Sequence, residues 1–245
     1  MVPAAAPTAD LSRGEATRRH IKLVALRLFA TQSLEAVSIR AIVKAAGQKN
    51  AGSINYYFRS KDALIRELIE DVARLLDAHH QRLLSALEAS GDPITVRGIL
   101  AILTAPPDSM AEDGGDDHAL RFLAMVMINH RDLLFQVVQG GVDRGIRRCF
   151  EHLRQLLPDY PAPLVQQRLM LAMLYLFAVG SSREAAREQP EAWRNLWGHP
   201  AAHENLLDAM EGLLTEPPSP GTLAALATPA PKQQKAAERR RRAQN

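Results

Sequence analysis

Residues 38–61 read SIRAIVKAAGQKNAGSINYYFRSK, and this stretch decides the fold of the N-terminal part of the chain. Ser38 stands directly before a short apolar segment, where its hydroxyl can cap the free amides that open a helix. Gly47 can supply the left-handed residue that ends this helix. A second short helix is expected over Gly52–Phe58, and Ser60 is placed to cap a longer one. The pattern predicts a helix-turn-helix, in which the first helix braces a second that lies in the major groove of DNA.

The second helix of this unit carries side chains suited to contact with DNA. Small residues at its start permit a close approach to the groove: Ala51, Gly52 and Ser53. Asn55 offers both a donor and an acceptor to base edges, and the hydroxyls of Tyr56 and Tyr57 can reach phosphate oxygens. Lys61 adds a positive charge in the first turn of the next helix, beside amides that also favour phosphate.

Helical periodicity extends to both sides of this unit. A helix is expected from Ala16 to Gln32, because its apolar residues follow the spacing of one buried face: Ile21, Val24, Ala25, Leu28 and Phe29. The helix that Ser60 caps is expected to run to Ala89, about 43 Å, which is long enough to join two domains. Further helices are expected over residues 94–104, 118–129, 133–157, 163–188 and 201–215. The sequence shows no alternating strand pattern, so the predicted fold class is all-α.

As an ordered set, these segments resemble the DNA-binding domain of the TetR family of bacterial regulators. The matching segments are LRLFA (26–30), SIRAIVKAAG (38–47), INYYF (54–58) and SKDALI (60–65), and the resemblance covers residues 17–68. It implies that Phe58 is a core residue. It implies contact with DNA bases or backbone for nine residues: Ser38, Arg40, Lys49, Asn50, Ser53, Asn55, Tyr56, Tyr57 and Lys61.

The chain departs from the commonest family pattern at one place. Ten residues separate Gly47 from Phe58, where that pattern has nine, and the extra residue falls within QKNAG. Which side chain faces which base is therefore open. For Arg40, pairing with an acidic neighbour such as Glu35 is the alternative to DNA contact.

The resemblance also implies an organisation for the whole chain. We expect a disordered N-terminal arm (1–14), a helix-turn-helix domain (15–62), a helical ligand-binding and dimerisation domain (63–215) and a disordered basic tail (216–245). Residues 105–117 are rich in proline, glycine and aspartate, which is typical of a loop. The basic tail either contacts flanking phosphates or only aids solubility.

The charge distribution agrees with one end of the molecule approaching a polyanion. Residues 12–66 contain 11 basic and 3 acidic residues, a net charge of +8, whereas residues 67–230 contain 13 basic and 22 acidic residues, a net charge of −9. The last 15 residues add 6 basic and 1 acidic residue. A basic end on an acidic body is typical of nucleic-acid binding, although a basic face can also be solvated surface.

In the family, the last two helices form a four-helix bundle with a second subunit. The apolar residues here that fit this role, or alternatively an intrachain core, are Leu169, Met173, Leu176, Phe177, Leu206, Leu207, Met210, Leu213 and Leu214. The C-terminal domain of the family also encloses an effector pocket. Polar and adaptable residues on the helices expected around it are Arg121, Met125, Asn129, His130, Gln136, Cys149, His152 and Tyr175.

Other classes of function have little support in the sequence. His199 and His203 have the i, i+4 spacing of helical metal ligands, but no third ligand is fixed nearby, so we expect neither a metal nor a cofactor, and no enzyme activity. Cys149 lies beside two arginines, which leaves a redox-active thiol as an alternative to a buried structural one. No secretory signal is expected, and the longest apolar run, 169–179, is shorter than the roughly 20 residues of a membrane span.

Together these features predict a cytoplasmic, nucleoid-associated transcriptional regulator. We expect a repressor that binds a palindromic operator as a homodimer and is released by a small amphipathic organic effector. The alternative is a DNA-binding regulator or structural protein without a ligand.

Overall fold

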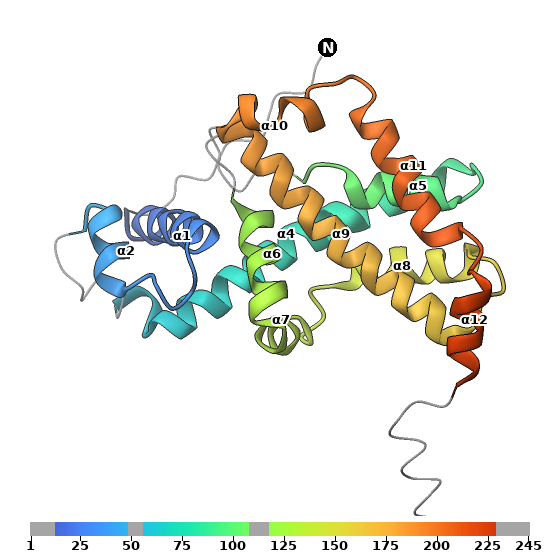
Figure 1. The fold of residues 1–245 in the computed structure, drawn as a ribbon. Helices are drawn as coiled ribbons and strands as arrows, with labels where there is room; N and C mark the ends of the chain where they lie inside the picture. Colours follow the sequence, from blue (N-terminus) through green and yellow to red (C-terminus); the bar gives the residue numbers. More distant parts are fainter. Residues whose placement is uncertain (1–12, 49–55, 108–117, 229–245) are drawn as a thin grey trace, which may run out of the picture.

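The computed structural model describes residues 13–48, 56–107 and 118–228, and every regular element in these ranges is helical. The helices are α1 (Arg13–Thr31), α2 (Ile39–Ala45), α4 (Lys61–Ser90), α5 (Val96–Thr104), α6 (Ala119–Asn129), α7 (Arg131–Val138), α8 (Arg144–Leu156), α9 (Ala162–Glu188), α10 (Pro190–Trp197), α11 (Ala202–Thr215) and α12 (Pro220–Ala227). Figure 1 shows α1 and α2 at one end of the molecule and α5, α8 and α11 toward the other, with α4 running between them. The all-α prediction is confirmed.

Local capping fixes the helices of the N-terminal unit as the sequence predicts. The Ser38 hydroxyl accepts a hydrogen bond from the Ala41 N–H at 3.1 Å, so it caps α2, and Gly47 is left-handed with φ +62°. The Ser60 hydroxyl caps α4 in the same way, at 3.1 Å from the Ala63 nitrogen. Residues 56–58 are helical, in agreement with the end of the expected second short helix.

The long connecting helix is also confirmed. α4 contains 30 residues, which corresponds to about 45 Å, and ends at Gly91, whose φ of +76° gives a left-handed cap. Its N-terminal half packs against α1, and its C-terminal half packs against α8 and α5. One rigid element therefore belongs to both ends of the molecule.

Three expectations for the C-terminal part are wrong. The single helix expected over 133–157 is two helices, α7 and α8, because Gly140 and Gly141 lie between them and Gly141 adopts φ +92°. Helix α10, which starts with Pro190 at its first turn, was not expected. A disordered tail was expected from residue 216 onward, but residues 220–227 form α12. Ser219 caps this helix by accepting a hydrogen bond from the Thr222 N–H.

The first hydrophobic core joins the N-terminal unit to the rest of the chain. Phe29 of α1 and Phe122 of α6 are fully buried, with ring centroids 6.3 Å apart. Leu64 and Leu68 from the N-terminal half of α4 belong to the same core. The apolar packing therefore continues across the domain boundary expected after residue 62.

The second core forms the far half of the molecule. It contains Leu84 of α4, Leu100 of α5, Leu153 of α8, Leu169 of α9 and Met210 of α11, each at most 4% exposed. Between the two cores, α4, α6, α8 and α9 converge, and the cavity described below lies there.

Helix α9 is apolar on more than its core-facing side. Within the described ranges it is the one helix whose length and apolar composition would let it cross a membrane, a weak indication because core helices of soluble proteins meet the same test. Only 22% of its most apolar window is buried within the chain. Leu171, Leu174 and Tyr175 are exposed and lie on one face by their i, i+3 and i+4 spacing.

Glycine at position 145 allows the close crossing of α4 and α8. A Cβ atom there would lie 2.8 Å from the Asp77 carbonyl oxygen and 2.9 Å from the Cβ of His80. We predict that Gly145→Ala lowers the free energy of unfolding by about 1–3 kcal/mol, because the two backbones must separate. The matched control is Gly212→Ala in α11, where a Cβ meets no atom within 4 Å and helix propensity favours alanine. Equal denaturant midpoints for both variants would contradict this account of the crossing.

Candidate nucleic-acid interface and ligand cavity

Helix α2 presents basic side chains to solvent at the end of the molecule where α1 and α2 lie. Arg40 is exposed, and among the described residues no carboxylate pairs with it. Glu35, the alternative partner, instead lies 3.4 Å from His130 Nε2. Lys44, one turn after Arg40, is also exposed. Sequence reasoning missed Lys44, although its i, i+4 spacing from Arg40 places both cations on one face.

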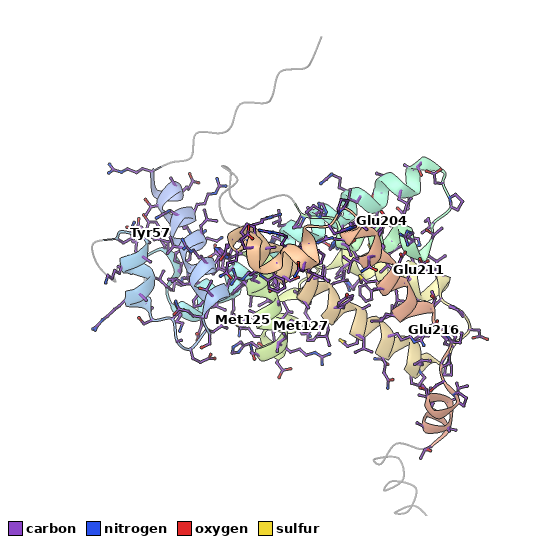
Figure 2. The ribbon with its side chains drawn as sticks, turned by 45° about the horizontal axis from the view of Figure 1, so that its top comes forward. Tyr57, Met125, Met127, Glu204, Glu211 and Glu216 are labelled. Atoms are coloured by element: carbon purple, nitrogen blue, oxygen red, sulfur yellow. The ribbon has the colours of Figure 1, made fainter. Side chains whose placement is uncertain are left out.

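An aromatic cluster anchors the end of the second short helix. Phe58 is 3% exposed, as expected for a core residue, and the Arg18 guanidinium lies 4.9 Å from its ring centroid. Tyr57, labelled in Figure 2, is half-buried and packs against the first core. Tyr56 is 81% exposed and meets the Tyr57 ring edge-on. Tyr56 is therefore the better placed of the two tyrosines to reach a phosphate.

The junction between this cluster and α4 carries two more cations. Lys61 is half-buried, with its Nζ 5.9 Å from the Phe29 ring centroid. Arg59 is exposed and left-handed, with φ +66°, and sequence reasoning did not include it. Four of the residues expected to contact DNA lie outside the described residues: Lys49, Asn50, Ser53 and Asn55.

Not every cation of the N-terminal unit is available to a polyanion. Arg18 Nη2 lies 2.5 Å from Glu67 Oε1, and Lys22 Nζ pairs with both Glu67 and Asp71. Burial alone would raise the pKa of Glu67, but hydrogen bonds from Lys22 and Arg18 outweigh it and lower the pKa below its ordinary value of 4.5. These pairs tie α1 to α4, so part of the net charge of the unit has a structural role.

The lowered pKa of Glu67 gives a pH-dependent contribution to stability. Ionised Glu67 stabilises the fold above pH 4.5, and this contribution is lost as the pH falls through the lower folded-state pKa. We predict that Glu67→Gln costs about 1 kcal/mol at pH 7, a modest value because the pairs are partly exposed. The difference from the wild type should vanish in acid-unfolding curves well below pH 4.5. An unchanged difference at low pH would contradict the ion-pair account, and the exposed Glu151→Gln on α8 is the control.

If α2 faces the DNA backbone, its exposed arginine neutralises a phosphate. We predict that Arg40→Gln weakens binding to all DNA sequences by a similar factor and reduces the slope of log affinity against log salt by about one unit. The matched control is Arg154→Gln, on the exposed side of α8 in the other half of the molecule, which should leave the slope unchanged. Equal slopes for wild type and Arg40→Gln in a fluorescence titration would remove Arg40 from the interface.

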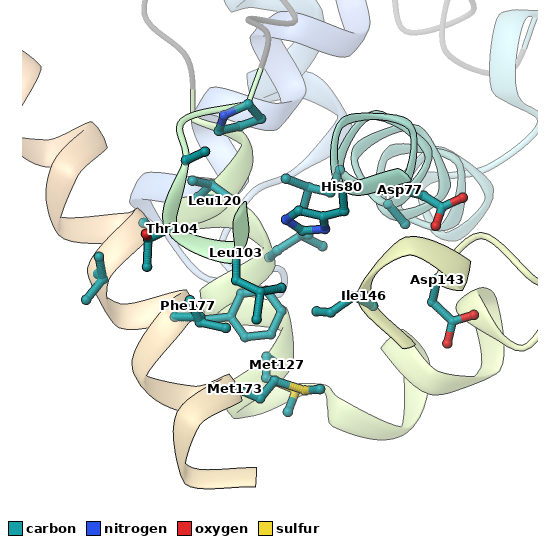
Figure 3. Close-up of a pocket in the computed structure, with 18 of the residues that line it drawn as sticks. Asp77, His80, Leu103, Thr104, Leu120, Met127, Asp143, Ile146, Met173 and Phe177 are labelled. Carbon is teal, nitrogen blue, oxygen red and sulfur yellow. The ribbon is translucent and has the colours of Figure 1, made fainter. Parts of the chain in front are cut away.

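A cavity of about 180 Å³ lies between the two cores. Its wall comes from α4, α5, α6, α7, α8 and α9, and Figure 3 shows His80 of α4 projecting into it beside Leu103 and Phe177. Most of the wall is apolar: Leu76, Leu103, Leu123, Met127, Leu134, Phe135, Ile146, Met173, Leu176 and Phe177. An apolar cavity with few polar groups has the character of a small-molecule site.

None of the eight residues expected to line the pocket belongs to its wall. Gln136 accepts a hydrogen bond from Arg66, Asn129 donates to the Met125 carbonyl, and His152 pairs with Glu88. These side chains lie outside this wall because the sequence does not fix the rotation of each helix about its axis. Other residues of the expected set also have contacts outside the cavity wall. Arg121 pairs with Glu188, and His130 pairs with Glu35. Met125 packs against the first core, and Tyr175 lies on the exposed stripe of α9.

Cys149 is a structural thiol. Its exposed fraction is 0%, and burial raises the pKa of the thiol to about 11, against a smaller opposite effect of Arg148. Burial thus favours the structural alternative for Cys149, since the reactive thiolate is disfavoured. The two histidines considered as metal ligands have other contacts: the Ala201 N–H donates to His199 Nδ1, and Arg183 lies 3.1 Å from His203 Nδ1.

The residues expected at a dimer interface lie mainly inside the chain. Leu169 and four residues of α11, Leu206, Leu207, Met210 and Leu214, are at most 4% exposed, so their side chains pack in the second core. Met173, Leu176 and Phe177 line the cavity, and Leu213 packs beside the second core. The five buried side chains fit the intrachain alternative, and the exposed apolar stripe of α9 consists of different residues.

A capped helix-turn-helix on a basic end, followed by a helical body, defines a DNA-binding transcriptional regulator. Residues 23–68 match the family model described as bacterial regulatory proteins, tetR family. This segment of the chain is therefore similar to the DNA-binding domain of TetR-family regulators.

Comparisons with solved structures agree with this fold. GusR of Salmonella enterica is 18% identical, with a TM-score of 0.52 and coverage of 83% of this chain and 98% of that one. NalD, the secondary repressor of the MexAB-OprM multidrug efflux pump in Pseudomonas aeruginosa, is 22% identical, with a TM-score of 0.48 and coverage of 82% and 97%. A search of curated proteins found no match. At these identities, the likeness to GusR supports the helical architecture alone.

Proposed function

We propose that the protein is a homodimeric repressor that binds a twofold-symmetric operator and is released by a small organic effector in the cavity between its two cores. The observation that carries this proposal is the position of α6. Phe122 and Val126 of α6 are buried in the core that contains α1, while Leu123 and Met127 of the same helix line the cavity. One helix thus contacts both the DNA-binding unit and the ligand space.

The exposed cations and aromatics of the N-terminal unit support the DNA-binding part. Arg40, Lys44, Arg59 and Tyr56 are all exposed at the same end of the molecule as the helix-turn-helix. One short recognition helix contacts too few base pairs for useful specificity, and a symmetric dimer doubles the sequence that is read. Lys49, Asn50, Ser53 and Asn55 stay candidates for base or backbone contact on the basis of the family resemblance.

The exposed stripe of α9 supports dimerisation through this helix. Leu171, Leu174 and Tyr175 are 54%, 40% and 38% exposed, and large apolar side chains grouped on one helical face are typical of a surface that a partner covers. A second copy of the chain would present the same stripe about a twofold axis. The proposed interface thus keeps the first of the two helices expected to form the bundle, α9. It uses a different set of side chains on that helix.

The path from the cavity to the DNA-binding unit supports ligand control. The cavity wall includes Ala73, Leu76 and Asp77 of α4, and Asp77 Oδ1 also accepts a hydrogen bond from the Gly145 N–H of α8 at 2.5 Å. A ligand that separates α4, α6 and α8 would move the N-terminal half of α4, because a helix transmits displacement as a nearly rigid rod. Two recognition helices must match major grooves about 34–36 Å apart, so a shift of a few ångströms disfavours simultaneous docking.

We predict that Leu171→Asp weakens dimerisation at least about 30-fold, because it would bury an unpaired charge at the interface. The control is Leu196→Asp on α10, an equally exposed leucine (51%) away from the stripe. Analytical ultracentrifugation gives the oligomeric state, and a gel shift with DNA from upstream of the protein's own gene gives operator binding.

The wild type and the control should bind this DNA as two chains per site, and the Leu171→Asp variant should lose specific binding. A wild-type monomer at micromolar concentration, or specific binding by a monomeric variant, would refute the dimer. Failure of the wild type to bind any DNA more tightly than unrelated sequences would refute the regulatory function itself.

A further inference from the structure

The volume of the cavity indicates the size of the group that it can enclose. An apolar cavity of 150 Å³ in another protein accommodates one benzene molecule. The cavity here is about 180 Å³, and its wall contains Phe135, Phe177, Met127 and Met173. Aromatic rings and thioethers pack well against the faces and edges of an aromatic ligand. The space fits a molecule about as large as one substituted aromatic ring.

His80 is the polar group of this wall that lacks a partner. The side chain is only 6% exposed, comes from α4 and projects into the cavity in Figure 3. Among the described residues, its Nδ1 atom has no hydrogen-bond partner. Its acidic neighbour, Asp77, is already used, since one carboxylate oxygen accepts from the Gly145 N–H and the other from Gln81 Nε2. A polar ligand group beside this imidazole would give a hydrogen-bond partner to a buried polar side chain.

The electrostatics of the wall favour an uncharged ligand. Burial, with a smaller contribution from His79 and against the opposing effect of Asp77, lowers the pKa of His80 to about 4, so the imidazole is neutral near pH 7. A neutral imidazole cannot balance the charge of a carboxylate or an ammonium group.

The charged residues of the wall have partners of their own. Both Glu184 carboxylate oxygens accept backbone N–H groups at the start of α6, from Leu120 and Arg121. Asp143 pairs with Arg147, and Arg183 donates to the Thr104 carbonyl at 2.7 Å. The remaining charged wall residue, Arg187, is exposed to solvent. A charged group deep in the cavity would therefore be desolvated without a compensating partner.

We propose that the cavity binds an uncharged, mainly apolar molecule the size of one aromatic ring, with a single hydroxyl-type group that hydrogen-bonds to the His80 imidazole. This inference rests on the proposed role of the cavity as the effector site and adds the chemical class of the effector. A hydroxyl group both donates and accepts, so it pairs with His80 in either neutral tautomer.

Three probes with the same ring test the assignment: p-cresol with a hydroxyl, toluene without a polar group and 4-methylbenzoate with a charge. Binding to the full-length dimer is measured by calorimetry and by ligand-observed NMR at pH 7.5. Toluene is the most apolar of the three and would bind best in a purely apolar cavity. We expect p-cresol to bind at least fivefold more tightly than either of the others.

The variant His80→Leu removes the hydrogen bond and leaves an apolar side chain. We expect it to lose about fivefold to tenfold in affinity for p-cresol and to bind toluene at least as well as the wild type. The matched control is His79→Leu, the neighbouring buried histidine, which is absent from the cavity wall and should leave the affinity for p-cresol unchanged. Thermal unfolding of each variant establishes that it is folded, and the comparison of the three probes on the wild type needs no variant.

The proposal is overturned if the wild type binds none of the probes, binds toluene or 4-methylbenzoate as well as p-cresol, or if His80→Leu leaves the preference for p-cresol intact. These outcomes are independent of DNA binding. If p-cresol binds in the expected His80-dependent way but operator affinity is the same with and without it, the ligand class is supported and the proposed induction fails.

Discussion

The packing of α6 against α1 is the interaction on which the organisation of this protein depends. Phe122 and Phe29 are both fully buried, and the same core continues into the N-terminal half of α4. A short helix-turn-helix unit has too little apolar surface to be very stable alone. The apolar side chains of this unit share one core with α4 and α6, so its position is fixed relative to the helical body. A movement of either helix would therefore displace the helix-turn-helix unit.

The cavity lies beside α4 and α6, the helices that share the first core with α1. Helices α4 and α8 cross closely at Gly145, and Asp77 bonds to the amide of that glycine, so the wall beside His80 is held on two sides. Around the cavity the interior is packed, so a ligand group larger than the free space would displace the helices of the wall. Leu123 and Met127 of α6 line the cavity, and Phe122 and Val126 of the same helix are buried in the first core.

Helix α9 serves two packing roles with two faces. Its inner face contributes Leu169 to the second core and Met173 and Phe177 to the cavity, while its outer stripe of Leu171, Leu174 and Tyr175 is left to solvent in a single chain. The apolar character of both faces explains why its sequence alone meets the criteria for a membrane span. It also explains why the residues expected at a dimer interface differ from the exposed stripe: when a helix is apolar all round, hydrophobic periodicity does not indicate which side faces a partner.

The sequence by itself determined the local structure at the N-terminal end, because capping and glycine chemistry act over a few residues. Ser38, Gly47 and Ser60 play the roles that their types predict, and the burial of Phe58 followed from the family resemblance. Only the tertiary structure decided which residues line the cavity, which apolar face of α9 is free and that the two ends of the molecule share a core. These properties depend on how each helix is rotated and on what lies against it, and such contacts join residues far apart in the chain. The sequence around His80 and around Gly145 does not indicate that these two residues lie against each other. Their contact is seen only in the tertiary structure, where α4 and α8 cross.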